Sequence, residues 1–274
     1  MKKDRRVALV TGASSGIGRA TANELVNAGY LVYGTSRNGA QAGLQPVRQL
    51  FPLLKMDVTD DKSVDAAVGE LLHLEGQIDL LVNNAGFGLG PAAAEESSIE
   101  QIRALFETNV LGVVRVTNAV LPVMRKQGGG RILNVGSGLG IIPAPYNAYY
   151  SATKHAIEGY SESLDHEVRE FGIRVAVIQP GVTRTSFDTS VTQPDKPLSD
   201  YDLSRKKYLV AYESALSAAD SPESVAETIV LAAEDRTHRL RYPSGKVAHQ
   251  GAFARRFLPR GFFDRILHKQ FGLG

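Results

Sequence analysis

The arrangement of apolar residues restricts the fold more than any other feature, because short, nearly continuous apolar runs alternate with longer segments of helical period. Runs of Val, Ile and Leu without polar alternation are typical of strands covered on both faces, as in a parallel sheet. We predict such strands over 6–12, 31–36, 51–58, 78–86, 130–137, 173–181 and, last, 238–243. The helical segments between them span 16–29, 63–74, 98–128, 149–172 and 221–235, and 98–128 is either one helix or two joined near Asn109 and Gly112. The chain is therefore expected to form a doubly wound parallel sheet of the α/β class.

The 274 residues suffice for one large α/β domain with a substantial core. The stretch 182–220 breaks the alternation, since it is polar with two prolines and then helical. A long excursion of this kind after a strand is more often a functional lid than a plain loop. We predict a single domain over 1–274, with a helical substrate lid at about 182–220 and a basic C-terminal extension at about 243–274.

Composition excludes several kinds of chemistry. Cysteine is absent, so the chain has no disulfide, no thiol nucleophile and no thiolate metal site. This fits a reducing compartment, and a cytoplasmic location is expected. The apolar run after the basic start covers only 7–10, and it is too short for a secretory signal or a membrane span. We expect no other segment to approach the length of a spanning helix, and no bound metal.

The net charge of +2 hides an asymmetry. Residues 236–274 carry nine Lys and Arg against one acid, Asp264, which gives +8 and leaves −6 for the other 235 residues. A basic tail can contact nucleic acid, anionic lipid or an acidic ligand. The alternative, a solvated helical face, is the one we favour, and no nucleic-acid partner is expected.

A glycine-rich turn, TGASSGIG at 11–18, lies between the first strand and the first helix. Gly12 permits a tight turn, Gly16 lets the backbone approach a pyrophosphate, and Gly18 lets the helix pack on the strand. The helix N-terminus then offers N–H groups to the phosphates, as in Rossmann-type domains. The spacing departs from the commoner G-x-G-x-x-G, so the general fingerprint is only partly met. The turn residues expected to contact a dinucleotide are Gly12, Ser14, Ser15, Gly16, Ile17 and Gly18.

The ends of the next strands predict which dinucleotide binds. An acid at the end of the second strand would select NAD, but Ser36 stands there and Arg37 follows. A guanidinium can pair with a 2′-phosphate, so we infer NADP(H), although Arg37 as ordinary surface charge is the alternative. Asp57 and Val58 end the third strand, where a carboxylate could accept from the adenine amino group. Further cofactor contacts are expected where the fourth strand ends, at Asn83, Ala85 and Gly86, although turn chemistry alone would also place Asn and Gly there.

The stretch YNAYYSATK at 146–154 holds three tyrosines and a lysine. In a helix, residues i and i+4 share a face. The i+4 residue of Tyr146 is Tyr150, and that of Tyr149 is Thr153; only Tyr150 gains a cation, from Lys154. An ammonium group nearby favours the phenolate and lowers the tyrosine pKa, as a general acid or base requires. Tyr150 is therefore the predicted acid/base, and the other two tyrosines are expected to shape the pocket.

These motifs together resemble the short-chain dehydrogenase/reductase family, over roughly residues 6–190. The T-G-x-x-x-G-x-G turn is Thr11 to Gly18, N-N-A-G is Asn83 to Gly86, and Y-x-x-x-K is Tyr150 to Lys154. The remaining family positions are the catalytic Asn and Ser, which look like Asn109 and Ser137, and the P-G loop at Pro180 and Gly181.

The resemblance implies hydride transfer between a nicotinamide and a carbonyl or alcohol carbon. It assigns proton transfer to Tyr150, a hydrogen bond to the substrate oxygen to Ser137, and a proton-relaying water to Asn109. Lys154 would lower the Tyr150 pKa and bind the nicotinamide ribose. The carboxamide would be held after the P-G loop, by Val182 and Thr185. The alternative function is a non-enzymatic NADP-binding sensor or scaffold on the same fold.

A weaker resemblance to the branch with 17β-hydroxysteroid and retinol dehydrogenases implies a small hydrophobic carbonyl or alcohol substrate. One apolar pocket wall is expected from Leu139, Ile141, Ile142, Pro143 and Pro145, and the other from 186–216 of the lid. The amphipathic segment 261–271 could lie on a membrane surface, but we favour its packing over the cleft or against another subunit. Relatives form dimers or tetramers through helices matching 98–126 and 149–171, so a homo-oligomer is expected unless the extension covers those faces.

Overall fold

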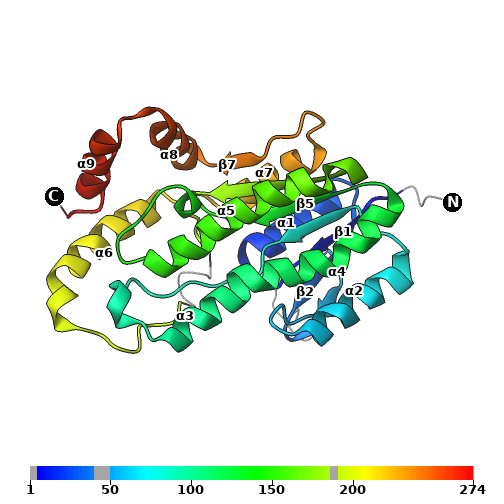
Figure 1. Ribbon diagram of the computed structural model, residues 1–274, viewed down its shortest axis with the longest axis horizontal. Helices are drawn as coiled ribbons and strands as arrows, with labels where there is room; N and C mark the ends of the chain where they lie inside the picture. The colour runs from blue at the N-terminus through cyan, green and yellow to red at the C-terminus, as the bar shows by residue number, and fades with distance from the viewer. Residues whose placement is uncertain (1–4, 40–49, 186–190, 274) are drawn as a thin grey trace.

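The computed structural model describes residues 5–39, 50–185 and 191–273, and within them one parallel sheet organises the molecule (Figure 1). Its seven strands stand in the order β3-β2-β1-β4-β5-β6-β7. They are β1 Val7–Val10, β2 Leu31–Ser36, β3 Leu53–Lys55, β4 Leu80–Asn83, β5 Gly130–Val135, β6 Ile173–Pro180 and β7 Arg241–Ser244. The predicted doubly wound, Rossmann-type sheet in a single domain is confirmed.

The order of the strands fixes where a ligand can bind. From β1 the chain winds outward through β2 to β3, and it then returns to place β4 on the other side of β1. The winding direction therefore reverses between β1 and β4. Open α/β sheets bind their ligands in the crevice at the carboxyl ends of the strands beside such a reversal.

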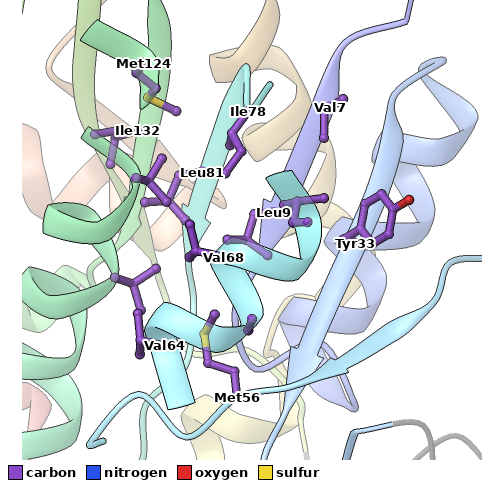
Figure 2. Close-up of a cluster of buried hydrophobic side chains, with 14 of the residues drawn as sticks. Val7, Leu9, Tyr33, Met56, Val64, Val68, Ile78, Leu81, Met124 and Ile132 are labelled. Atoms are coloured by element: carbon purple, nitrogen blue, oxygen red, sulfur yellow. The ribbon is translucent and has the colours of Figure 1, made fainter. Parts of the chain in front are cut away.

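Helices cover both faces of the sheet. One face carries α1 Gly16–Asn27 and α7 Pro222–Glu234, and the other carries α2 Asp61–Glu75, α4 Gly112–Gln127 and α5 Ala148–Val168. Strand β1 shows why its run is continuously apolar: Val7 and Leu9 belong to the core under α2, α4 and α5, whereas Ala8 and Val10 belong to the core under α1 and α7. Figure 2 shows the first of these cores, where Leu9, Val68 and Leu81 lie close together.

The long predicted helix is one continuous run with a wider turn inside it. It consists of α3 Ile99–Phe106, a π-helical turn at Glu107–Leu111, and α4. Among the described residues only this run, Ile99–Gln127, is long and apolar enough by length and composition to cross a membrane. That corrects the expectation that no segment approaches such a length. Because Val116, Val120 and Met124 are buried in the core, the apolar residues of this run have a structural role in the fold.

Several element ends differ from the prediction. Helix α2 begins at Asp61, two residues early, because Asp60 caps it by accepting a hydrogen bond from the Lys62 backbone N–H. The strand expected at 51–58 is only Leu53–Lys55, at the edge of the sheet. The predicted cap of α7 is confirmed, with the Ser221 side chain accepting from the Ser224 N–H and Pro222 in the first turn.

Beyond β6 the chain leaves the sheet and forms the lid, which contains α6 Asp202–Ser217. After β7 it forms α8 Lys246–Phe257 and α9 Arg260–Gln270. Figure 1 shows α6, α8 and α9 together at one end of the molecule, outside the layers that cover the sheet. The predicted helix at 261–271 is thus found as α9, whereas α8 was not foreseen. Lid residues 186–190 lie outside the described residues.

Candidate active site

The glycine turn has the backbone that the sequence predicted. Gly12 and Gly16 have φ angles of +65° and +52°, in the left-handed region that side chains rarely adopt. A Cβ on Gly18 would lie 2.3 Å from the Gly12 carbonyl oxygen, so only glycine fits where α1 passes the turn. All three glycines are therefore required by the local geometry.

An asparagine that we had not singled out ties this turn to β4. The Asn84 side chain donates to the carbonyl oxygens of Thr11 and Gly12, at 2.9 and 3.1 Å. In return the Thr11 hydroxyl oxygen accepts from the backbone N–H groups of Asn84 and Ala85. The two strands on either side of the reversal are thus held together at their carboxyl ends. An Asn-Asn pair is typical of a turn, and the sequence did not indicate that Asn84 would contact Thr11 and Gly12.

The start of α1 fits a dinucleotide phosphate. Ser15 is the N-cap residue in an extended conformation, is exposed, and makes no side-chain capping bond to the helix. The first turn of α1 therefore presents backbone N–H groups at its positive end, beside the turn that Gly16 opens. Ser14 and Ile17 flank this position and are half-buried. The residues present thus match the requirements of a pyrophosphate.

The ends of β2 and β3 place two cations together. Arg37 and Lys55 line one cavity of about 360 Å³ next to Gly39. The Ser36 side chain is buried, and its hydroxyl donates to the Gly39 carbonyl. Lys55 was not among the predicted cofactor contacts, because in the sequence it is only a polar residue within the predicted third strand. The cavity thus has two cations and one acid, Glu70 of α2, in its lining, and there is no acid at Ser36, where a ribose 2′-substituent is expected.

Asp57 and Val58 follow β3. Hydrogen bonds from the backbone N–H and then the hydroxyl of Thr59 lower the Asp57 pKa, with a further contribution from the positive charge of Arg37. Both bonds reach Oδ1, so Oδ2 is the atom suited to the predicted adenine contact. Val58 is buried with its side chain beside Gly112, and only its backbone can serve a ligand.

The residues at the end of β4 divide between core and crevice. The buried Asn83 side chain donates to Thr117 and Asn134, at 3.0 and 2.9 Å, so it joins β4 to α4 and β5. A Cβ on Gly86 would lie 3.0 Å from Asn109 Oδ1, so in this structure Gly86 makes room for Asn109. This is a second reason for glycine there, besides the predicted space for the cofactor.

Asn109 lies in the π-helical turn and is buried. Its carboxamide pairs with the backbone of Phe87, accepting from the N–H at 3.0 Å and donating to the carbonyl at 2.9 Å. It also donates to the Thr153 hydroxyl at 3.4 Å, one residue before Lys154. The wider turn thus brings the long helix into contact with the loop after β4 and with α5, as π-turns at functional sites often do.

Tyr150 and Lys154 stand one turn apart on α5, as predicted. Lys154 Nζ lies 5.5 Å from the centroid of the Tyr150 ring and donates to the Val135 carbonyl at 2.9 Å. Burial lowers the pKa of Lys154 to about 8. The ammonium remains mostly protonated at neutral pH, and its other N–H groups can serve a ligand. The pair has the composition of an acid/base unit.

Ser137 follows β5 and begins the short 3-10 turn Gly138–Gly140. Its Oγ accepts from the Leu139 backbone N–H at 3.1 Å, which leaves the hydroxyl proton to be donated. The extended backbone of Ser137 is an ordinary conformation. The site at the carboxyl ends of β4 and β5 thus combines a hydroxyl donor with the tyrosine and the lysine.

The last expected cofactor contacts follow β6. Pro180 ends the strand, and the Gly181 N–H donates to Ser244 of β7. The Val182 carbonyl accepts from the Asp220 N–H at 3.0 Å. Thr185 lies beside Gly16, since a Cβ built there would be 3.5 Å from the Thr185 Cβ. Thr185 thus faces the glycine turn across the crevice.

The other two tyrosines connect the start of α5 to the lid and to the segment after β4. Tyr146 precedes the helix and has a φ angle of +58°, so the i+4 comparison did not apply to it. Its hydroxyl donates to Ser204 of α6 at 2.6 Å, and the Tyr149 hydroxyl donates to the Ala94 carbonyl at 2.8 Å. Asn147 adds a bond of 2.8 Å to the Tyr208 hydroxyl. The expectation that Tyr146 and Tyr149 shape the pocket agrees with this placement.

A buried ion pair anchors the lid from the other side. The Glu96 carboxylate is fully buried and accepts two bonds from Arg205 of α6, at 2.8 and 2.7 Å, with a third from the Leu198 N–H. Burial by itself would raise the Glu96 pKa, but the Leu198 N–H and the guanidinium outweigh it and lower the pKa. Because the partners are 109 residues apart, no local pattern could have revealed them.

A small cavity of about 10 Å³ adjoins Tyr150. Its lining comes from the loop after β4 and the start of α5, namely Leu89, Gly90, Ala92, Ser97 and 146–150. The predicted wall of Leu139, Ile141, Ile142, Pro143 and Pro145 does not line it. Ile142 instead lies against α8, where a Cβ on Gly251 would be 2.5 Å from its Cδ1. This volume holds about one water molecule, so the cavity by itself is too small for the predicted substrate.

Comparisons with known proteins agree on the family. The family model described as short chain dehydrogenase matches residues 6–196. A 3-ketodihydrosphingosine reductase of Bacteroides thetaiotaomicron is 44% identical over 66% of this chain, and the matched region is 65% of that protein's length. An uncharacterized oxidoreductase of Bacillus subtilis, YusZ, is 37% identical over 97% of the chain and 99% of its own length. Mouse 17-beta-hydroxysteroid dehydrogenase type 1 is 37% identical over 87% of the chain and 73% of its length.

Solved structures give the same result. A short-chain dehydrogenase from Streptomyces avermitilis has a TM-score of 0.79 at 33% identity, covering 97% of this chain and 95% of that one. A 3-ketoacyl-(acyl-carrier-protein) reductase from Brucella melitensis, complexed with NADH, has a TM-score of 0.74 at 27% identity, covering 87% and 96%. ElxO with NADP bound has a TM-score of 0.72 at 25% identity, covering 89% and 99%. With the glycine turn, the Asn-Asn loop and the Tyr150–Lys154 pair in place, the chain belongs to the short-chain dehydrogenase/reductase family of oxidoreductases.

Proposed function

We propose that this protein is an NADP(H)-dependent oxidoreductase that interconverts a carbonyl and an alcohol on a hydrophobic substrate, with Tyr150 as the general acid/base. The observation that carries the proposal is the buried Lys154 ammonium, 5.5 Å from the Tyr150 ring centroid, beside the Asn109–Thr153 contact. Burial disfavours the charged form of this lysine, and its bond to the Val135 carbonyl uses only one of its N–H groups. Perturbed groups of this kind concentrate at functional sites.

In this proposal each residue of the site has a separate role beside the cofactor. A bound nicotinamide supplies the hydride for reduction and accepts it in the reverse direction. Tyr150 gives its hydroxyl proton to the substrate oxygen during reduction and takes it back during oxidation. Lys154 stabilises the resulting phenolate, and Ser137 donates its hydroxyl to the oxygen on which charge develops. Asn109, fixed by Phe87, holds the loop after β4 against α5 so that these groups keep their positions.

NADP(H) is the proposed cofactor because Arg37 and Lys55 offer two cations against one acid, Glu70, at one cavity, and Ser36 offers no carboxylate to repel a phosphate. The similar solved structures include complexes with NADH and with NADP, so the choice rests on these residues. Gly12, Gly16 and the start of α1 would hold the pyrophosphate.

A hydrophobic substrate is proposed from the lining of the cavity and from the relatives. The cavity beside Tyr150 carries Leu89, Ala92 and the rings of Tyr146 and Tyr149. Two relatives have names that specify a ketosphingoid and a hydroxysteroid, and most of each molecule is hydrocarbon. The homo-oligomer, the lack of a nucleic-acid partner and the cytoplasmic location stay predictions.

A panel of carbonyl compounds and alcohols, followed by NADPH absorbance with NADH as comparator, tests the proposal. We expect turnover of apolar ketones or aldehydes, faster with NADPH. Preference for hydrophilic sugars, or for NADH, would contradict it. The alternative of a cofactor-binding sensor predicts cofactor binding without turnover of any compound, although the intact Ser137, Tyr150 and Lys154 favour an enzyme.

A further inference from the structure

We propose that the outer face of α6, α8 and α9 docks on an anionic membrane surface and brings the substrate site to the lipid. We define this docking surface by its apolar members, which are Leu203 and Val210 of α6, Phe253 and Phe257 of α8, and Phe262 and Ile266 of α9. Their exposure ranges from 41% for Ile266 to 72% for Leu203. Monomeric proteins seldom expose so many large apolar side chains at one end, and such groupings mark interaction sites.

Helices α8 and α9 each have an exposed apolar face. In α9 the inner face has Phe263, which is buried, whereas Phe262 and Ile266 point to solvent one turn apart. Phe253 and Phe257 of α8 are likewise one turn apart, with ring centroids separated by 4.7 Å. We expected the C-terminal segment to pack over the cleft or against another subunit. In the structure one side of α9 packs against the protein and the other side is exposed to water. An amphipathic helix with Phe on one side and basic residues on the other is typical of an interfacial helix.

Positive charge accompanies the apolar side chains. Between residues 246 and 270 the chain has six Lys and Arg against one acid, whereas the rest of the chain sums to −3. The Arg256 and Arg265 guanidinium groups lie over the rings of Phe257 and Phe262, at 5.5 and 6.0 Å from the centroids. Each ring thus carries a cation at its side, which could contact a lipid phosphate while the ring enters the acyl boundary.

Helix α6 continues the pattern. Leu203, Lys206, Lys207 and Val210 have the spacing of one helical face, and all four are exposed. The end of α9 lies next to this face, since a Cβ on Gly272 would be 3.4 Å from the Lys207 carbonyl oxygen. The surface therefore extends from the C-terminal helices onto the lid.

The docking surface is the reverse side of the elements that enclose the site. Through its inner face α6 holds Tyr146 and Asn147, by way of Ser204 and Tyr208. The Phe271 ring is 5.7 Å from the Tyr208 ring, which links α9 to the same contact. A membrane under the docking surface would thus lie beside the lid, where an apolar substrate could pass from the bilayer to the site.

The chemistry of the surface favours lipid over other occupants. A two-fold interface between copies would place this positive charge against itself. A nucleic acid would use the cations and rings, but it offers nothing to the aliphatic side chains of Leu203, Val210 and Ile266. An anionic bilayer satisfies both kinds of group.

Flotation of the full chain with vesicles tests this inference. We expect binding to phosphatidylcholine vesicles that contain phosphatidylserine, and much weaker binding to phosphatidylcholine alone or at high salt. The double variant Phe253→Ser/Phe257→Ser and the double variant Arg256→Glu/Arg265→Glu should each weaken binding roughly tenfold or more, since both apolar and ionic contacts contribute. The matched controls are Leu231→Ser on α7 and Arg103→Glu on α3, both exposed and on helices outside the docking surface, and they should bind like the parent.

Failure of the parent chain to bind anionic vesicles would overturn the inference, as would equal losses in the controls. Equal binding to neutral and anionic vesicles would also contradict it. If size-exclusion chromatography showed that Phe253→Ser/Phe257→Ser converts an oligomer to a monomer, the surface would be a contact between copies. The inference rests on the proposed function in one respect: the proposed apolar substrate supplies the reason for docking on a membrane. Because flotation needs no turnover, and Tyr150→Phe should float like the parent, failure of one proposal is distinguishable from failure of the other.

Discussion

Lys154 Nζ lies 5.5 Å from the centroid of the Tyr150 ring while it donates to the Val135 carbonyl, the last residue of β5. One buried cation therefore joins the central sheet to the residue proposed to move the proton. The position of the tyrosine follows from the helix, and the position of the ammonium group follows from both helix and strand. This explains why a change at Lys154 should affect stability and activity in opposite directions.

Lys154→Met should stabilise the fold and abolish turnover. Burial lowers the Lys154 pKa from 10.5 to about 8, so between these pH values the unfolded chain binds more protons than the folded one. The parent protein thus gains stability as pH rises through this window and carries the full cost of the buried charge below it. Removing the charge should raise the free energy of unfolding at pH 7 by on the order of 1–3 kcal/mol. Urea unfolding at pH 7 and pH 10 measures this, and the gain should shrink at the higher pH; a variant less stable at both would contradict it.

Gly18→Ala should disrupt the turn at the start of α1. The new Cβ would lie 2.3 Å from the Gly12 carbonyl oxygen and 2.4 Å from Asn84 Nδ2, so the bridge between β1 and β4 must shift. We expect a loss of roughly 1–3 kcal/mol in the free energy of unfolding, and weaker binding of NADPH. Gly69→Ala in α2 is the matched control, because nothing lies within 4 Å of its Cβ position. It should gain up to about 1 kcal/mol, and equal losses in both variants would exclude steric overlap as the cause.

Arg37→Ala should reduce the preference for NADPH. If the guanidinium pairs with the 2′-phosphate, its loss should raise KM for NADPH about tenfold or more and leave KM for NADH nearly unchanged. Lys55→Ala should act in the same direction, since Lys55 shares the cavity with Arg37. The control Arg103→Ala removes an exposed arginine from α3. Equal changes with the two cofactors would place Arg37 outside the 2′-phosphate site.

Glu96→Gln should loosen the lid. The change leaves Arg205, only 14% exposed, without its buried counter-charge, and we expect a loss on the order of 2 kcal/mol from the contact between α6 and the loop after β4. KM for the substrate should rise, and proteolysis within the described part of the lid should become faster. Glu100→Gln is the control, because Glu100 makes an exposed ion pair with Arg103 within α3 and not with the lid. A lid equally resistant to proteolysis in both variants would refute the role of the ion pair.

Much of this arrangement was predictable because it depends on local patterns. Continuous apolar runs identified the buried parallel strands, and the four-residue spacing selected Tyr150 over its neighbours. The turn at Gly12 and Gly16 was recognisable because positive φ angles favour glycine, so the backbone conformation is reflected in the residue type. The bounds of the edge strand β3 were less predictable, since a strand with one neighbour needs fewer apolar residues to define its length.

The contacts that close the site were not predictable, because they join residues far apart in the chain. Glu96 and Arg205 look like surface charges until the fold buries them. The helical pattern marked Asn109 as a possible joint in the long helix, and the family resemblance assigned it a proton-relaying water, but neither indicated that its carboxamide binds the backbone of Phe87. Tyr146 was compared by helical spacing although it precedes the helix in a left-handed conformation. In each case the decisive interaction is tertiary, and a single sequence carries no local sign of it.

If Tyr150 moves the proton, Tyr150→Phe should lose turnover and keep NADPH binding, and both are measured on the same preparation. The substitution removes one oxygen and leaves the ring and Lys154 in place. We expect kcat to fall by roughly 10²–10⁴-fold on the best substrate of the carbonyl panel while the Kd for NADPH stays close to that of the parent. A variant that reduces the same substrate at a rate near that of the parent would contradict it.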